Sequence, residues 1–464
     1  MRFAVLDLGF LAFLGAVALL GLKRPFLWVL AFIYVDIVSP QDISWGFLKS
    51  IPVSLLFFLA AFGGWLVFDS KRGSRFTFRQ WLMLLFFGLC AYTTTQAAFP
   101  VEAAAKWGWV WKSLLFGMFL PLTLRTRARV EAAVLIMVLA AGSIMISAGI
   151  KTVLSGGGGY GTLSSYVRDN SGIYEGSTLS AVAITIVPLI AWLAKHGTVF
   201  PPDWRVKSFA FCLGFACLLV PVGTQTRTGL LCIGVCAVMA LRDAKRRFLL
   251  MGLMGTLGLM AIPFLPQSYL ERMGTIETHD ADTSASTRVA VWLDTLEYVK
   301  QNPMGGGFEA YLGNQIKYRT RQAVQTGDTV TIEYVDVVDK ARAYHSAYFE
   351  VLGEHGWLGV ALWLAIQLLG LLQMELIRWR LRKSTDPVDR ANASLANALQ
   401  MGHVIYLVGS LFVGIAYQPF IFYLVAVEIG LVLAVKRRAA PVEARGVPGA
   451  RQALQPVALA GQQA

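Results

Sequence analysis

Charged residues are scarce in this sequence. Asp, Glu, Lys and Arg make up 15% of the 464 residues, whereas hydrophobic residues make up 56%. A soluble globular domain has about 25% charged residues, so this balance excludes an ordinary soluble enzyme. It predicts a polytopic membrane protein.

Cysteine and histidine are also scarce, with five residues of each. All the cysteines lie inside apolar runs, where a free cysteine packs as a small hydrophobic side chain, so no disulfide framework is expected. No two histidines have metal-ligand spacing, because His345 and His355 would lie on different faces of a helix. We therefore expect no metal site.

The sequence also lacks a nucleotide-binding loop. The run SGGGGYG at 155–161 resembles a phosphate-binding loop but lacks the Gly-Lys-Ser/Thr ending. It falls in a connection expected outside the cytosol, where no ATP is available. A flexible hinge over the outer mouth of the protein is the better interpretation.

What the sequence has instead is a series of apolar runs. About 12 or 13 of them approach the length needed to cross ~30 Å of hydrocarbon, and the weakest are the first two. The expected fold is an all-α polytopic membrane protein with one large loop between the tenth and eleventh spans. The runs lie near 3–22, 25–39, 47–68, 80–98, 107–124, 130–150, 177–195, 207–222, 227–241, 247–264, 345–377, 397–414 and 418–435.

The positive charges gather in short connections between these runs. The net charge is +13, from 41 Lys and Arg against 28 Asp and Glu. Successive basic clusters are separated by even numbers of predicted spans, so all should face one side, and cytoplasmic loops carry this excess. The charge therefore indicates orientation, and nucleic acid is not an expected partner. The clusters lie at 71–79, 125–129, 242–247, 378–383 and 436–438.

The connection at about 265–344 is the only long segment of soluble character, and such loops are uncommon unless they are functional or disordered. Within it, 286–301 has helical spacing, with Ser286 and Thr287 as N-cap candidates. NPMGGG at 302–307 predicts a turn, and 328–338 alternates like a strand. We expect a periplasmic insertion.

The remainder of the domain organisation is simple. Residues 1–438 are expected to form one membrane domain that contains this insertion. The tail at 439–464 has no apolar period, so it is expected to be a disordered cytoplasmic end.

The position of the titratable His345 at the start of an apolar run requires an explanation. It begins the apolar run 345–377 on the outer side, as the first or second residue of the expected helix. The unpaired N–H groups and the dipole at a helix N-terminus disfavour a positive charge, so they lower the pKa of an imidazole there. The ring is then neutral at about pH 7 and can accept a proton. The alternative is an interfacial histidine without a chemical role.

Two arginines are expected on the same side. Arg227 begins an apolar run from the outer side, against the positive-inside pattern, either as a snorkelling side chain or as a cation for an anionic ligand. Arg288 is expected in the first turn of the loop helix, where a cation opposes the helix dipole unless an anion binds there. Two arginines and a neutral histidine around one pocket suit a phosphate leaving group and a hydroxyl nucleophile.

Three motifs follow one another in the second half of the chain. The first is TQTRTGLL around Arg227, and the second is Arg288 and Trp292 followed by NPMGGGF. The third is led by His345 and continues through Leu352, Glu354, Gly356 and Gly359. In this order they resemble the O-antigen ligase and Wzy-type polymerase superfamily. The stretch 22–47 further resembles the O-glycosylation ligases associated with exosortase A systems.

The resemblance implies an enzyme of the bacterial inner membrane that takes part in polysaccharide biosynthesis or O-glycosylation. Such enzymes transfer a glycan from undecaprenyl diphosphate to a hydroxyl acceptor at the periplasmic face, and they need neither nucleotide nor metal. By this resemblance Arg227 and Arg288 would bind the diphosphate. His345 would position or deprotonate the acceptor, with inversion at the anomeric carbon. Tyr348 and Glu354 would line or brace the pocket. Members often have Asn after the histidine, whereas this chain has Ser346.

Two alternatives stay open at this point. A ligase and a polymerase share the donor and differ in the acceptor, which is lipid A-core, a protein Ser or Thr, or a growing glycan. A transporter of an anionic solute would use the arginines as a substrate site. Transporters place such sites near the midplane on broken helices, whereas these charges are expected at the outer rim beside a large loop.

Overall fold

The fold is described from a computed structural model of the whole chain. The structure describes residues 2–44, 46–72, 74–155, 173–242, 245–265, 269–270, 283–326 and 329–439. The predicted glycine hinge beyond Ser155 and the predicted tail beyond Ala439 lie outside these described residues.

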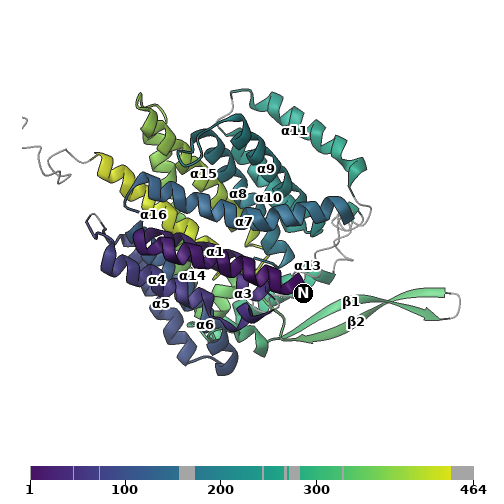
Figure 1. Cartoon of the computed structure of the whole chain (residues 1–464). Helices are drawn as coiled ribbons and strands as arrows, with labels where there is room; N and C mark the ends of the chain where they lie inside the picture. The colour runs from purple at the N-terminus through teal and green to yellow at the C-terminus, as the bar shows by residue number, and fades with distance from the viewer. Residues whose placement is uncertain are drawn as a thin grey trace, which may run out of the picture.

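Helices make up nearly all of the described fold, and every apolar run predicted from the sequence coincides with a helix (Figure 1). The first part of the chain contains α1 (Arg2–Lys23), α2 (Phe26–Val38), α3 (Pro40–Ile43), η1 (Phe47–Ser50), α4 (Val53–Phe68), α5 (Phe78–Thr95), α6 (Pro100–Thr123), α7 (Arg127–Ser155) and α8 (Gly176–His196). The middle contains α9 (Trp204–Gly223), α10 (Arg227–Leu241), α11 (Arg247–Ala261), η3 (Ile262–Phe264), α13 (Thr283–Gln301) and η5 (Ala310–Gly313). The last part contains β1 (Gln315–Thr326), β2 (Thr329–Lys340), α14 (Ala347–Leu381), α15 (Pro387–Gly409) and α16 (Pro419–Ala439).

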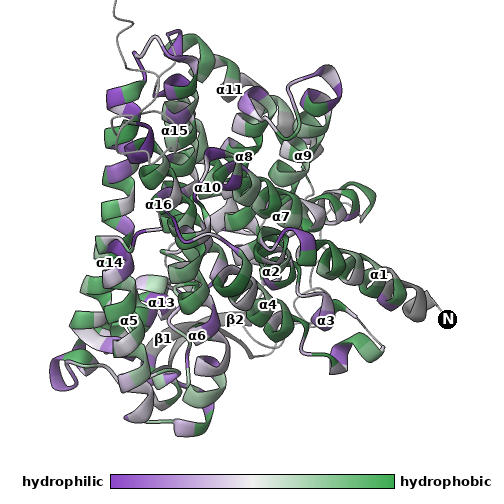
Figure 2. Cartoon of the chain, turned by 60° about the vertical axis from the view of Figure 1, so that its left-hand side comes forward, coloured by the Kyte–Doolittle hydropathy of each residue, from purple (hydrophilic) through white to green (hydrophobic). Residues whose placement is uncertain are grey.

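The helices have the length and hydropathy of membrane spans. Within the described residues, five are long and apolar enough to cross a bilayer, namely α7, α8, α9, α14 and α16. Shorter apolar helices accompany them at 26–38, 53–68, 227–241 and 247–260. Hydrophobic residues, drawn in green, dominate most of the helices (Figure 2). The chain is an all-α membrane protein, and the total of 12 or 13 spans stays a prediction.

The core is centred on α16. Its residues from Pro419 to Leu431 are all buried, and it packs against α6, α7, α14 and α15. Between Pro419 and Leu431, Glu428 is its only charged residue, and a helix so largely apolar fits such a central place because no side of it needs to face water.

A polar network crosses this core. Arg79 of α5 pairs with Glu428 of α16 at 2.9 Å, and His403 Nδ1 of α15 lies 2.8 Å from the second oxygen of Glu428. His403 Nε2 lies 3.0 Å from Oε1 of Gln367 on α14. The placement of Arg79 in a cytoplasmic loop is therefore wrong, because α5 begins at Phe78 and the Arg79 side chain is buried. His403 lies inside the apolar run 397–414 but serves as a polar partner, because a buried carboxylate requires partners.

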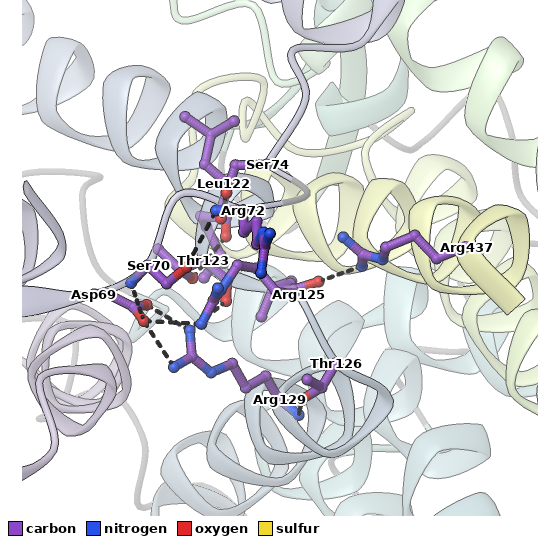
Figure 3. A network of polar contacts seen from close by, with 12 residues as sticks. Asp69, Ser70, Arg72, Ser74, Leu122, Thr123, Arg125, Thr126, Arg129 and Arg437 are labelled. Atoms are coloured by element: carbon purple, nitrogen blue, oxygen red, sulfur yellow. Dashed lines mark hydrogen bonds and ion pairs between the residues drawn. The ribbon is translucent and has the colours of Figure 1, made fainter. Parts of the chain in front are cut away.

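The predicted basic clusters meet at one end of the helices. Figure 3 shows Asp69 accepting hydrogen bonds from Arg125 at 3.0 Å and from Arg129 at 2.5 and 3.1 Å. In the same network, Arg437 donates to the carbonyl oxygen of Leu124 at 3.0 Å. These contacts join the connection after α4, the connection after α6 and the end of α16.

The two remaining basic clusters belong to the same end. Glu375, near the end of α14, pairs with Arg242 at 3.3 Å and with Arg378 at 2.5 Å. Arg438 pairs with Asp386 and Asp389, which lie at the start of α15. The residues that begin α14 lie at its opposite end.

The segment between α13 and α14 differs in detail from the prediction. Helix α13 begins at Thr283, so Ser286 and Thr287 lie inside it and are not its caps. Arg288 consequently lies in the second turn, and the helix-dipole argument for it is wrong. The predicted strand is β2, which pairs antiparallel with β1 from Gln315 opposite Lys340 to Thr326 opposite Thr329.

The two strands form a long ribbon that projects from the helical body (Figure 1). Its base is closed by Asn314. The Asn314 side chain accepts from Arg342 N at 2.9 Å and donates to Arg342 O at 2.7 Å. The Asn314 carbonyl accepts from Ala341 N at 3.2 Å.

The predicted turn at 302–307 packs against a break in α14. Gly356 has φ +64, and a Cβ there would lie 1.9 Å from the carbonyl oxygen of Pro303. Gly306 N and Gly307 N donate to the carbonyls of Gly353 and Glu354 at 3.0 and 2.9 Å. The break frees carbonyls that an unbroken helix would use internally, and the turn satisfies them.

The Arg79–Glu428 pair provides a test of the core. Glu428→Ala should lower the free energy of unfolding by about 3–5 kcal/mol, because Arg79 would stay buried without its carboxylate. The change would be measured as the melting temperature of the purified protein in detergent. The control Glu297→Ala removes an exposed carboxylate and should leave the melting temperature near wild type. An unchanged melting temperature for Glu428→Ala would contradict this role.

Candidate functional site

A cavity of about 580 Å³ lies at the end of the helices opposite the basic clusters. Its walls come from α6, the first turn of α8, α13, the residues before and within η5, the start of α14 and the 412–414 connection. Pockets of about 300–1,000 Å³ are typical of small-molecule sites, so the space suits a ligand headgroup.

Three of the residues predicted from the sequence line this cavity. They are Arg288 of α13, His345 just before α14, and Glu354 within α14. Trp292 explains how α13 and the His345 segment are held together. Its indole Nε1 donates to the carbonyl of Tyr344 at 2.9 Å, and its ring stacks on Phe349 with centroids 5.0 Å apart.

His345 has an unusual backbone. It lies two residues before the first residue of α14 and has φ +48, in the left-handed region. The prediction that it is the first or second helical residue is therefore wrong, and Ser346 occupies the N-cap position instead. A left-handed conformation is uncommon for a residue other than glycine, so the surrounding contacts must hold it.

The imidazole of His345 is held in its neutral form. Its pKa is lowered, first because the cavity walls shield the ring from bulk water, and next because Arg288 and Arg342 are nearby cations. Glu175 opposes this effect on the pKa. The pKa of His345 is thus lowered, as predicted, but by burial and neighbouring cations and not by the helix dipole. The neutral ring is available to accept a proton.

Arg227 does not line the cavity among the described residues. It is half-buried and begins α10. The preceding Thr226 donates to Ser180 of α8 at 2.8 Å. Glu175, Ser177 and Thr178, at the start of α8, do line the cavity. The start of α10 is therefore joined to the helix whose first turn borders the space.

Tyr348 does not line the cavity either. Its hydroxyl donates to the carbonyl of Leu407 at 3.1 Å, and its ring contacts Trp363 edge-on at 5.3 Å. The hydrogen bond fastens the start of α14 to α15, and the ring contact lies within α14.

Sequence reasoning missed a buried ionic cluster beside Arg288 and His345. Lys106 of α6 lies 2.8 Å from Glu350, 2.8 Å from Glu354 and 3.2 Å from Glu309. Lys106, Glu350 and Glu354 are buried, and Glu309 is partly exposed. We name these four residues the lysine cluster.

Backbone and aromatic groups complete the lysine cluster. Ala416 N donates to Glu350 at 3.1 Å, and Glu309 N donates to Glu354 at 3.0 Å. The Lys106 ammonium lies 5.0 Å from the ring centroid of Tyr417 and 5.6 Å from that of Phe308.

The cluster was missed because 99–106 was assigned to a connection. Helix α6 in fact begins at Pro100, which places Lys106 inside it. The i, i+4 spacing of Glu350 and Glu354 was the available signal, since it puts both carboxylates on one face of α14.

Comparison with known families bears on the second half of the chain. Residues 209–364 match the O-antigen ligase family. This match supports the O-antigen ligase and Wzy superfamily resemblance and a glycan-transfer function of the ligase or polymerase type. Residues 5–198 match a family of unknown function (DUF5935). No curated protein matches the chain.

The cavity is built from both matched segments. Lys106 and Glu175 come from the segment of unknown function, whereas Arg288, His345 and the three glutamates of the lysine cluster come from the O-antigen ligase segment. Neither segment encloses the space alone. The assignment to the exosortase-associated subgroup stays a prediction.

Lys106→Met tests how far the cavity depends on the lysine cluster. Removing the ammonium leaves three carboxylates facing one another in a buried space, which should cost about 3–5 kcal/mol of stability. The melting temperature in detergent should therefore fall clearly. Lys207→Met, at an exposed position on α9, is the matched control and should be close to wild type. Equal melting temperatures for the two variants would show that the cluster does not stabilise the fold.

Proposed function

We propose that this protein is a membrane glycosyltransferase of the ligase type. It transfers an oligo- or polysaccharide from undecaprenyl diphosphate to a hydroxyl acceptor at the periplasmic face of the bacterial inner membrane. The observation that carries the proposal is that Arg288 and His345 line one cavity within the segment that matches the O-antigen ligase family.

Arg288 acts on the donor in this proposal. Its guanidinium binds the diphosphate and stabilises the negative charge that grows as the sugar–phosphate bond breaks. Arg227 is the proposed second cation for the same group.

His345 acts on the acceptor. Its neutral imidazole accepts the proton of the acceptor hydroxyl while the hydroxyl oxygen attacks the anomeric carbon. The bond from that carbon to the phosphate oxygen breaks on the opposite face, so the anomeric configuration inverts. The electron pair of the broken bond leaves with undecaprenyl diphosphate.

The distribution of charge supports the orientation. The basic clusters lie at the opposite end of the helices from the cavity, and cytoplasmic connections carry such an excess of Lys and Arg. In this orientation the cavity opens toward the periplasm, and 265–344 is a periplasmic insertion. A lipid-linked donor would reach the cavity from the same bilayer.

His345→Ala and Arg288→Ala should each reduce glycan transfer by at least about 100-fold, because general-base catalysis and charge stabilisation contribute on this scale. Arg227→Ala should reduce transfer as well. The assay uses purified protein, a defined undecaprenyl-diphosphate-linked oligosaccharide and candidate acceptors. The control His196→Ala lies at the other end of α8 and should transfer normally. Wild-type transfer by the His345 variant would refute its role as the base.

The products of a deletion strain separate the ligase from the polymerase. Full-length glycan left on the lipid carrier indicates a ligase. A defect in chain length indicates a polymerase.

The pH dependence of transfer follows from the lowered pKa of His345. The neutral form is active, so transfer is retained above the lowered pKa and lost as the pH falls through it. Arg342→Gln removes a cation that lowers this pKa, so the acidic limb of the pH–rate profile should move to higher pH. Arg380→Gln, near the end of α14, is the control and should leave the limb in place. No difference between the two profiles would contradict the assignment.

A further inference from the structure

The charged groups of the cavity fall into two sets. His345 is influenced by Arg288, Arg342 and Glu175, whereas Lys106 contacts the three glutamates of its cluster. The first set is rich in cations. The second has three carboxylates around one ammonium, and an anionic diphosphate would be repelled from it.

Helix α6 builds the wall next to this second set. Glu102, Lys106 and Trp109 follow one another at spacings of four and three residues, which places them on one face of the helix, and all three line the cavity. Glu102 is exposed and Trp109 is half-buried. Glu309 and Tyr311, from the residues at η5, line the same cavity.

These side chains suit a ligand rich in hydroxyl groups. Ionised carboxylates only accept hydrogen bonds, so they select a ligand that donates them. Trp109 and Tyr311 provide aromatic faces that combine apolar contact area with a polar edge, as the C–H and O–H faces of a sugar ring require.

We propose that α6 forms the saccharide-binding wall of the cavity. Glu102 and Trp109 bind a hydroxyl-rich saccharide together with Glu309 and Tyr311, and Lys106 positions Glu309. This inference rests on the proposed function and extends it, because it assigns a task to the segment that matches the family of unknown function. The saccharide is either the donor sugar next to the diphosphate or the acceptor glycan, since both present the same hydroxyl chemistry.

Binding measurements test the wall without requiring turnover. The full-length protein in lipid nanodiscs would be titrated with two probes. One is free oligosaccharide released by mild acid from the lipid-linked glycan of the native host, and the other is undecaprenyl diphosphate without sugar. Trp109→Ala and Glu102→Gln should each weaken oligosaccharide binding by about tenfold, as expected for a lost contact to a charged or aromatic partner, and leave diphosphate binding unchanged. Arg288→Ala should show the reverse pattern.

Matched controls are available within the chain. Trp81→Ala removes an exposed tryptophan from α5, and Glu297→Gln neutralises an exposed carboxylate on α13. Neither residue lines the cavity among the described residues, so both variants should bind both probes like wild type. Wild-type oligosaccharide binding by Trp109→Ala and Glu102→Gln would overturn the proposal, as would an equal loss of both probes in the two variants.

Kinetic measurements identify the source of the saccharide. A rise in KM for the lipid-linked donor in Glu102→Gln assigns the wall to the donor sugar, and a rise in KM for the acceptor assigns it to the acceptor glycan. No change in either KM would overturn the wall. If the wild type binds oligosaccharide through Trp109 but transfers no glycan, the proposed function fails while the saccharide wall stands.

Discussion

The geometry of the cavity depends on one buried ammonium group. Lys106 holds Glu309, Glu350 and Glu354 within 3.2 Å, and these residues come from the η5 segment and from α14. Opposite charges enclosed away from water cannot separate without a large loss of free energy, so this contact fixes α6 against both. It also joins the two segments that match different families. The wall with Arg288 and His345 and the wall with Trp109 therefore keep a defined spacing.

Helix α14 connects this contact to a second buried network. Glu350 and Glu354, near its start, belong to the lysine cluster, and Gln367, farther along, bonds to His403. Intramembrane ionisable groups are stable when each has a partner on a neighbouring helix. The two networks tie α14 to α6 near the cavity and to α15 and α16 deeper in the bundle. The helix thus carries the site and also anchors it in the core.

The sequence predicted the parts of this structure that depend on local patterns. Apolar runs located the helices, and clustered Lys and Arg located the end opposite the cavity. The motifs around Arg288 and His345 led to the prediction that these two residues lie at one pocket, and both line the cavity. Lys106 and Arg79 were misjudged because their partners lie far away in the sequence, and hydropathy periodicity says nothing about pairing at such distances. The start of α13 was misplaced because four of the residues at 283–287 are Ser or Thr. Such residues occur at the N-cap of a helix and also within its first turn. Strand β1 was missed because its many charged and amide side chains obscure the alternation.

The ribbon of β1 and β2 is joined to the body at Asn314, which bonds to both Ala341 and Arg342. This clamp closes the ribbon at its base, immediately before the residues that lead to His345. The path of the chain from the ribbon to the cavity is therefore set at the base of the hairpin and not by its outer portion. Natural relatives or engineered versions could lengthen, shorten or replace that portion while the polypeptide entering α14 keeps the same path.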